Sequence, residues 1–142
     1  MKGYIVLLVS LMLVAAIGLA APENKGKPNQ LYLYEKTGDP GWDIVEDGAW
    51  GKLHYDDYFV FNGHGLEAGV EYTLLRVGIE WTDNPVCLGT ATVNNGGNVH
   101  IAGEFIGDGE KVWLILTDDF DCDNQNWMDW NYEEYLFENN LI

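Results

Sequence analysis

The sequence predicts an all-β fold, an antiparallel β-sandwich of about eight strands that is immunoglobulin-like or jelly-roll-like. From Gln30 onward, short apolar or aromatic runs alternate with turn residues, and no long window has the 3.6-residue repeat of a helix. The runs are regularly spaced along the chain. Because no helix is available to cover the apolar face of a sheet, we expect a second sheet to cover it.

The expected strands follow from the apolar runs and from the Gly, Pro, Asn and Asp residues that separate them. They span residues 31–34, 42–45, 49–55, 58–61, 70–79, 87–93, 98–105 and 111–117. The tail from Trp127 to Ile142 mixes acidic and aromatic residues. Its pattern does not separate a short helical turn from a final strand.

One turn gives a clear hairpin signal. Asn94, Asn95, Gly96 and Gly97 stand between two β-rich runs, and Asn and Gly accept the positive φ that tight hairpin turns require. We therefore expect residues 90–93 and 99–102 to pair with each other.

The amino-terminal segment has the pattern of a signal peptide. Lys2 precedes an apolar run, and small residues at Gly18 and Ala20 suit cleavage after Ala20. The competing interpretation is an uncleaved membrane anchor. We expect residues 1–20 to be the signal peptide, residues 21–30 a flexible leader, and residues 31–142 a single domain, with no membrane span after the signal is removed.

The chain is strongly acidic, with 23 acidic residues against seven basic ones and a formal net charge of −16. Phosphate binding needs clustered Lys and Arg, so this charge argues against nucleic acid and anionic lipid as partners. It is compatible with cation binding, but also with an exported protein that is kept soluble by its charge. We expect an extracellular or cell-surface partner whose identity the sequence does not give.

Cys87 and Cys122 are the two cysteines of the chain. An even count in an exported protein favours a disulfide, and acidic neighbours of Cys122 disfavour a reactive thiolate. We expect one bridge that stabilises the fold by about 3–4 kcal/mol through the loop it closes.

An acidic segment follows the last expected strand. Alternate aspartates resemble the opening of a calcium loop, which makes calcium a candidate cofactor. The expected metal ligands are Asp119, Asp121, Asp123 and Asp129. The sixth and twelfth loop positions lack the usual Gly and Glu, and the alternative is a solvated acidic loop.

Six tryptophans are many for 142 residues. Trp113 lies in an apolar run and is expected to be buried. Trp81, Trp127 and Trp130 lie in or near polar segments, where exposed rings stack on sugars or proteins. The alternative is that these three rings cap the ends of the sandwich.

Catalytic motifs are missing, so we expect no enzyme. The only serine is Ser10, within the expected signal peptide, and His54, His64 and His100 lie in separate segments without metal-ligand spacing. Adjacent carboxylates such as Glu133 and Glu134 leave a small carboxylate-dependent hydrolase as the least favoured alternative.

Several segments of the chain together carry a resemblance to a group of proteins. They are residues 61–66, 69–74, 96–103, 111–116 and 135–138. Together they resemble a group of uncharacterised secreted, β-sandwich-like domains found in archaeal and bacterial exported proteins. The resemblance covers most of residues 31 to 142. It implies a secreted or cell-surface β-rich domain, and it implies no activity and no site residues.

These observations predict a non-catalytic secreted or cell-surface domain with a binding or structural role. The first alternative is a calcium-stabilised carbohydrate-binding module, because the sequence offers both an acidic loop and tryptophans near polar segments. The second alternative is the carboxylate-dependent hydrolase.

Overall fold

The computed structural model of the protein describes residues 29–80 and 84–138. The predicted signal peptide, residues 21–28 of the predicted leader, and Trp81 lie outside the described residues. Within the described ranges, no helix is long and apolar enough to cross a membrane.

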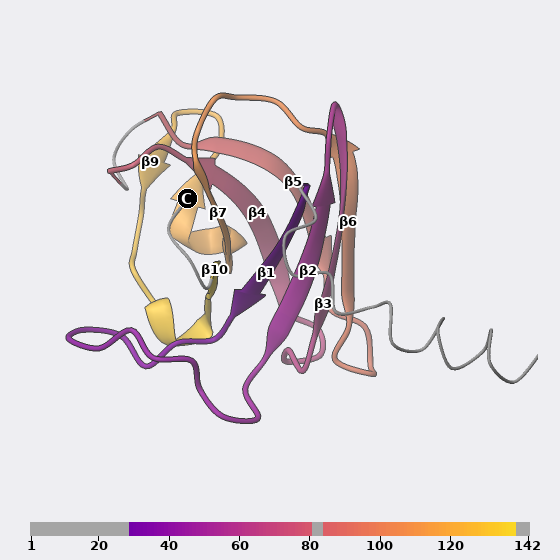
Figure 1. Ribbon diagram of the computed structural model, residues 1–142, viewed down its shortest axis with the longest axis vertical. Coiled ribbons are helices and arrows are strands. Elements are labelled where there is room, and N and C mark those ends of the chain that lie inside the picture. Colours follow the sequence, from indigo (N-terminus) through magenta and orange to yellow (C-terminus); the bar gives the residue numbers. More distant parts are fainter. Residues whose placement is uncertain (1–28, 81–83, 139–142) are drawn as a thin grey trace, which may run out of the picture.

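Eight strands form one sheet in which every pairing is antiparallel (Figure 1). They are β1 (Gln30–Tyr34), β2 (Trp50–Tyr55), β3 (Tyr58–His64), β4 (Glu71–Val77), β5 (Val86–Thr92), β6 (Val99–Glu104), β7 (Lys111–Leu116) and β10 (Leu136–Glu138). Their order across the sheet is β5-β4-β7-β10-β1-β2-β3-β6. The prediction of an antiparallel all-β fold is confirmed, and hydrogen bonding links all eight strands into one nearly closed sheet.

The chain between β7 and β10 forms a C-terminal segment, residues 117–135, with only short elements. They are the 3₁₀ turn η1 (Thr117–Asp119), β8 (Phe120–Asp121), β9 (Asn126–Trp127) and the 3₁₀ turn η2 (Tyr132–Glu134). The two structures that the tail pattern left open therefore both form: η2 is a short helical turn, and β10 is the final described strand.

The concave face of the curled sheet encloses the main apolar core. Side chains of β2 and β3 alternate between buried and exposed, so Leu53, Phe59 and Phe61 point inward. They pack in one cluster with Leu74 of β4 and Leu114 of β7. The period-two pattern of the sequence thus defines the inner face directly.

The predicted hairpin is correct as a turn and wrong as a strand pairing. Asn94 Oδ1 accepts hydrogen bonds from the main-chain N–H groups of Gly96 and Asn98, at 2.9 and 3.1 Å. The strands that the turn joins pair elsewhere, β5 with β4 and β6 with β3, and they are the two edge strands of the sheet order. The turn brings the two edges together where the sheet curls, and that long-range closure is not encoded in the local pattern.

The predicted strand at residues 42–45 is wrong. Residues 35–49 form a loop in which only one isolated bridge, Lys36 with Ile44, is present. Trp42 has φ of 50°, and its N–H donates to the Gly38 carbonyl at 2.8 Å. The chain thus reverses at residues 38–42, which prevents an extended strand there.

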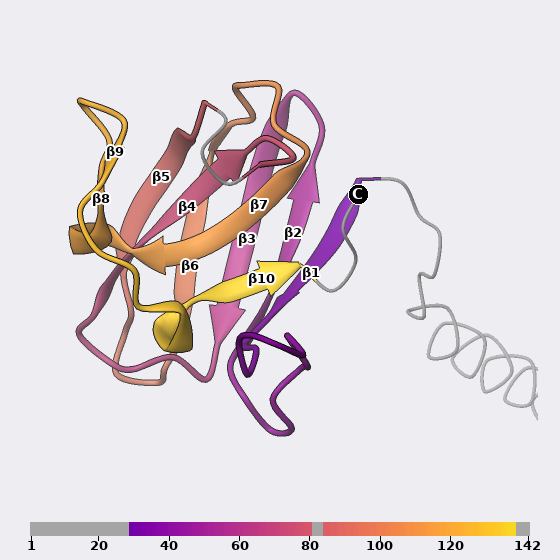
Figure 2. The same ribbon diagram turned by 90° about the vertical axis from the view of Figure 1, so that its left-hand side faces the viewer.

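The C-terminal segment covers the outer face of β4 and β7. These two strands bury side chains on both faces, and a second cluster joins Leu75, Trp113 and Ile115 to Phe120 and Tyr135 of the segment. Figure 2 shows the segment on the side of the molecule opposite to β1 and β2.

The predicted disulfide is confirmed. Cys87 of β5 is bonded to Cys122, just after β8, with their Cα atoms 5.9 Å apart. The bridge fastens the C-terminal segment to the sheet edge.

Candidate functional site

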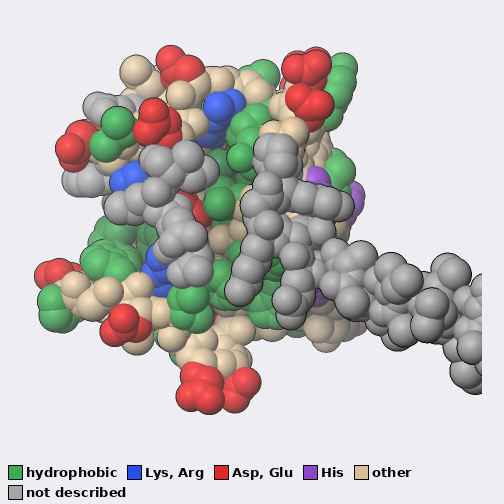
Figure 3. All heavy atoms as spheres, in the orientation of Figure 1, with side chains coloured by type: hydrophobic (Ala, Val, Ile, Leu, Met, Phe, Trp, Pro, Cys, Tyr) green, Lys and Arg blue, Asp and Glu red, His purple; other side chains and the backbone are tan. Residues whose placement is uncertain are grey.

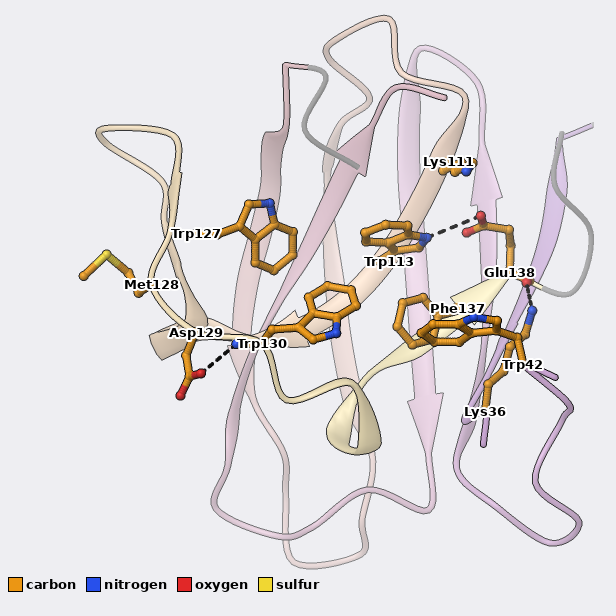
Figure 4. Close-up of a pocket in the computed structure, with 10 residues that line it drawn as sticks. All are labelled: Lys36, Trp42, Lys111, Trp113, Trp127, Met128, Asp129, Trp130, Phe137 and Glu138. Atoms are coloured by element: carbon orange, nitrogen blue, oxygen red, sulfur yellow. Dashed lines mark hydrogen bonds between the residues drawn. The ribbon is translucent and has the colours of Figure 1, made fainter. Parts of the chain in front are cut away.

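A large pocket lies where the outer face of β7 and β10 meets the C-terminal segment and the 35–49 loop. Its volume is about 1040 Å³, at the upper end of the range usual for ligand sites. Aromatic rings dominate its wall, with a few charged side chains among them (Figure 4). The lining residues are Lys36, Trp42, Lys111, Trp113, Trp127, Met128, Asp129, Trp130, Phe137 and Glu138. We call this site the tryptophan pocket.

The sheet supplies the fixed part of the aromatic wall. In β7, Val112 and Leu114 fill the inner core, so the alternating residue Trp113 faces outward. Its indole ring is 7% exposed and lies 5.3 Å, centroid to centroid, from the ring of Phe137 on β10. The burial expected for Trp113 is confirmed.

The 35–49 loop and the C-terminal segment supply the other rings. Trp42 makes an edge contact with Phe137 at 5.3 Å. Trp127 and Trp130 lie 5.2 Å apart, and both are within 6.5 Å of Trp113. Two of the three tryptophans predicted to stack on a ligand, Trp127 and Trp130, are therefore brought together in one wall, with Trp130 41% exposed.

Glu138 places a carboxylate at one end of the tryptophan pocket. Its side chain is 2% exposed, and Oε1 accepts a hydrogen bond from Trp113 Nε1 at 3.3 Å. Oε2 has no hydrogen-bond partner in the described part of the chain. Burial raises the pKa of Glu138 above its ordinary value, while hydrogen bonds and the charges of Lys111 and Lys36 oppose that rise.

Two ammonium groups lie at the same end as Glu138 (Figure 4). Lys36 Nζ donates to the main-chain carbonyl of Glu138 at 2.5 Å, and Lys111 Nζ donates to the carbonyl of Ile79 at 2.8 Å. Burial lowers the pKa of Lys36, an effect opposed by the charge of Glu138. On the face of the molecule drawn in Figure 3, most acidic side chains lie around the edge, whereas lysine and arginine side chains lie nearer the middle.

The geometry alone therefore describes a rigid aromatic wall with one polar end. Comparisons with protein-family models, with curated proteins and with solved structures each find no match. The resemblance to exported β-sandwich-like domains stays a prediction. The chemistry of the pocket must be derived from its own residues.

The four aspartates predicted to bind calcium are not gathered around one point. The Asp119 carboxylate is turned into the protein, where it accepts hydrogen bonds from the Tyr135 hydroxyl and from Asn131 Nδ2. Asp121 instead holds its own turn, accepting from the side chain of Asn124 at 2.8 Å, which lowers its pKa. Among the described residues no group of three His, Cys, Asp or Glu side chains is placed to hold a metal ion, so the calcium site stays a prediction.

The other titratable candidates lie away from the tryptophan pocket. His54, His64 and His100 are on β2, β3 and β6, and none of them lines it. Glu133 and Glu134 are exposed on η2 and do not line it either. The structure therefore brings no candidate catalytic side chain from the sequence together with the aromatic wall.

The sequence analysis did not identify several of the residues that line the tryptophan pocket. Trp42 was assigned to a strand, and Phe137 and Glu138 were assigned no role. The missed signal for Glu138 is a charged residue that ends the apolar run Tyr135-Leu136-Phe137, because a carboxylate that continues a buried strand is rare without a function or a partner. Lys36 and Lys111 gave no signal that sets them apart from other surface lysines.

Proposed function

We propose that the protein is a non-catalytic binding domain of an exported protein and that the tryptophan pocket is its binding site. The observation that carries the proposal is the pocket itself, in which Trp42, Trp113, Trp127 and Trp130 converge with Phe137. Concave sites lined mainly by aromatic side chains, with a few placed polar groups, are the usual architecture of ligand-binding sites. The ligand would present apolar ring faces to these indoles.

Binding is favoured over catalysis by the polar groups at hand. Both cysteines are bonded to each other, and the described residues that line the pocket include no serine, threonine or histidine. Histidine is the most frequent general base, and serine, threonine and cysteine are common nucleophiles, so a catalytic role would have to rely on carboxylates and lysines alone. Glu138 and Asp129 are the carboxylates of the lining, and Asp129 already accepts a hydrogen bond from the Trp130 main-chain N–H at 2.8 Å.

The wall is also held in place before any ligand arrives. Trp113 and Phe137 are on paired strands of the sheet, and the Cys87–Cys122 bond fastens the segment that carries Trp127 and Trp130. A site with preformed rings loses little conformational entropy on binding. Export is supported by the signal-peptide pattern of residues 1–20 and by the disulfide, which persists in oxidising compartments.

A ¹⁵N-labelled sample tests the proposal, because each indole N–H of the six tryptophans gives its own NMR signal. Titration with a library of small ring compounds, indole among them, should shift the signals of the pocket tryptophans. The matched control is Trp50, which is 40% exposed on β2, close to the 41% of Trp130. Trp130→Ala should weaken binding, whereas Trp50→Ala should not. No shift with any compound, or equal shifts at Trp50, would contradict the proposal.

For the fold, we also propose a sandwich in which β1, β2, β3 and β6 face β4, β5 and β7. The support is the inner core, where Leu53 and Phe61 from one side pack with Leu74 and Leu114 from the other. The proposal includes the expectation that this sandwich is immunoglobulin-like or jelly-roll-like.

A further inference from the structure

The polar end of the tryptophan pocket contains a buried acceptor that the protein does not use. Glu138 is 2% exposed, and its Oε2 has no hydrogen-bond partner among the described residues, although its Oε1 receives the Trp113 indole N–H. A buried carboxylate oxygen without a donor is unfavourable. Glu138 lines the pocket, so a ligand there can supply the missing donor.

Donors stand beside this acceptor. An ammonium group carries three N–H bonds, and Lys111 Nζ uses one of them on the Ile79 carbonyl. Lys36 Nζ likewise uses one on the Glu138 carbonyl. The polar end therefore offers a ligand one carboxylate acceptor and several ammonium N–H donors within the same small region (Figure 4).

The balance of charge excludes strongly charged ligands. A cationic ligand would pair with Glu138 but would be repelled by Lys36 and Lys111. An anionic ligand would pair with the lysines but would be repelled by Glu138 and by Asp129 across the pocket. Among the described lining residues, two side chains are positive and two are negative, so a neutral ligand meets no net repulsion from them.

A hydroxyl group is neutral and both donates and accepts hydrogen bonds through a single oxygen atom. Sugar rings carry neighbouring hydroxyl groups along their edges and C–H groups on their faces. Such a ring matches the two parts of this site, since its faces suit the indoles and its edge suits Glu138 and Lys111.

We propose that the tryptophan pocket binds a neutral sugar ring, with Glu138 Oε2 accepting a hydrogen bond from one hydroxyl group and Lys111 Nζ donating one to its neighbour. This inference rests on the proposed function and adds the class of ligand and the residues that recognise it. Trp42 and Trp130 would stack on the faces of the ring.

Calorimetric titration of the disulfide-bonded protein tests the inference with four kinds of probe. They are neutral pentasaccharides of glucose, mannose, xylose and N-acetylglucosamine, the cation choline, the anion trigalacturonate, and indole as a ring without hydroxyl groups. We expect at least one neutral pentasaccharide to bind. We expect Glu138→Gln to weaken that binding about tenfold, because a charge-assisted hydrogen bond becomes a neutral one.

Two further variants keep the test sharp. Lys111→Met, which removes the ammonium group and keeps most of the aliphatic stem, should weaken saccharide binding roughly threefold to tenfold. Asp118→Asn, an exposed carboxylate outside the pocket, is the matched control and should bind as the wild type does.

The outcomes separate the two proposals. Indole binding without any saccharide binding would overturn the sugar inference and leave the proposed function standing. Tighter binding of choline or trigalacturonate than of every neutral sugar would also overturn it, as would saccharide binding that neither Glu138→Gln nor Lys111→Met weakens. No binding of any probe, together with indole N–H signals that do not move, would contradict the proposed function itself.

Discussion

The hydroxyl group of Tyr135 donates a hydrogen bond to the carboxylate of Asp119, inside the protein. Asp119 is 4% exposed and Tyr135 is fully buried. Asn131 Nδ2 donates to both oxygens of the same carboxylate, at 3.1 and 3.0 Å. This buried network ties the start of the C-terminal segment to its end, and so it holds the backbone that carries Trp127 and Trp130.

Asp119→Ala should therefore destabilise the protein by about 2–4 kcal/mol, because it leaves the buried Tyr135 hydroxyl and the Asn131 amide without their acceptor. Urea unfolding followed by tryptophan fluorescence measures the effect. The control is Asp118→Ala, an exposed neighbour on the same 3₁₀ turn, which should change the midpoint little. Equal effects of the two substitutions would show that the network does not stabilise the segment.

The same network bears on the calcium prediction. An inward-facing Asp119 is not free to join Asp121, and Asp123 and Asp129 are exposed at separate points of the segment. We expect neither millimolar Ca²⁺ nor EGTA to move the melting temperature by more than about 1 °C. Differential scanning calorimetry of the wild type checks this. A rise of several degrees with Ca²⁺ that Asp121→Ala abolishes would restore the calcium loop as a metal site.

Sequence patterns anticipated what depends on neighbouring residues. The alternation in Tyr58-Phe59-Val60-Phe61 specified both β3 and its buried face, and the Asn and Gly content of residues 94–97 specified the turn. The patterns failed where contacts between distant segments of the chain determine which strands pair. The partners of β5 and β6 depend on how a whole sheet curls, and no local signal carries that information.

The candidate site was anticipated in part for the same reason. Trp127 and Trp130 lie close together in the chain, so their shared location could be predicted. Trp42 joins them only because a loop after β1 reaches β10, and Glu138 faces the tryptophan pocket only because β10 pairs between β1 and β7. Convergence of residues about one hundred positions apart is a property of the topology.

The Cys87–Cys122 bond should stabilise mainly the C-terminal segment. A double Cys87→Ala, Cys122→Ala variant should lose about 3–4 kcal/mol of unfolding free energy, since the bridge spans a sequence separation of 35. Hydrogen exchange by mass spectrometry should show that the double substitution accelerates exchange, relative to the wild type, more in residues 117–135 than in β2 and β3. Uniform acceleration over the whole chain would mean instead that the bridge acts only through the unfolded state.

Gly51 should tolerate no side chain, because it is buried on β2 directly against the ring of Phe61. A Cβ atom there would clash with the buried Phe61 ring, including an approach of 2.6 Å to Cε2. Gly51→Ala should cost about 1–3 kcal/mol through overpacking. Gly103→Ala on β6 is the matched control, because its nearest neighbour, Phe59 Cε1, is 3.4 Å away. A comparable loss in both variants would show that strand glycines matter for another reason.

The pKa of Glu138 predicts how stability depends on pH. Burial raises this pKa in the folded protein above the ordinary value of 4.5, so the folded state binds the proton more tightly than the unfolded state does. The resulting stability is fully present below pH 4.5 and is lost as the pH rises through the raised pKa.

Glu138→Gln keeps the shape and removes the charge, so it should gain stability relative to the wild type at pH 8 and lose that advantage near pH 4.5. Each step of one in the pKa corresponds to about 1.4 kcal/mol. Chemical denaturation of both proteins at the two pH values measures the difference in their unfolding free energies. The titrations of other groups largely cancel in this difference. An advantage of the variant that grows toward acid pH would mean that the folded state holds Glu138 ionised.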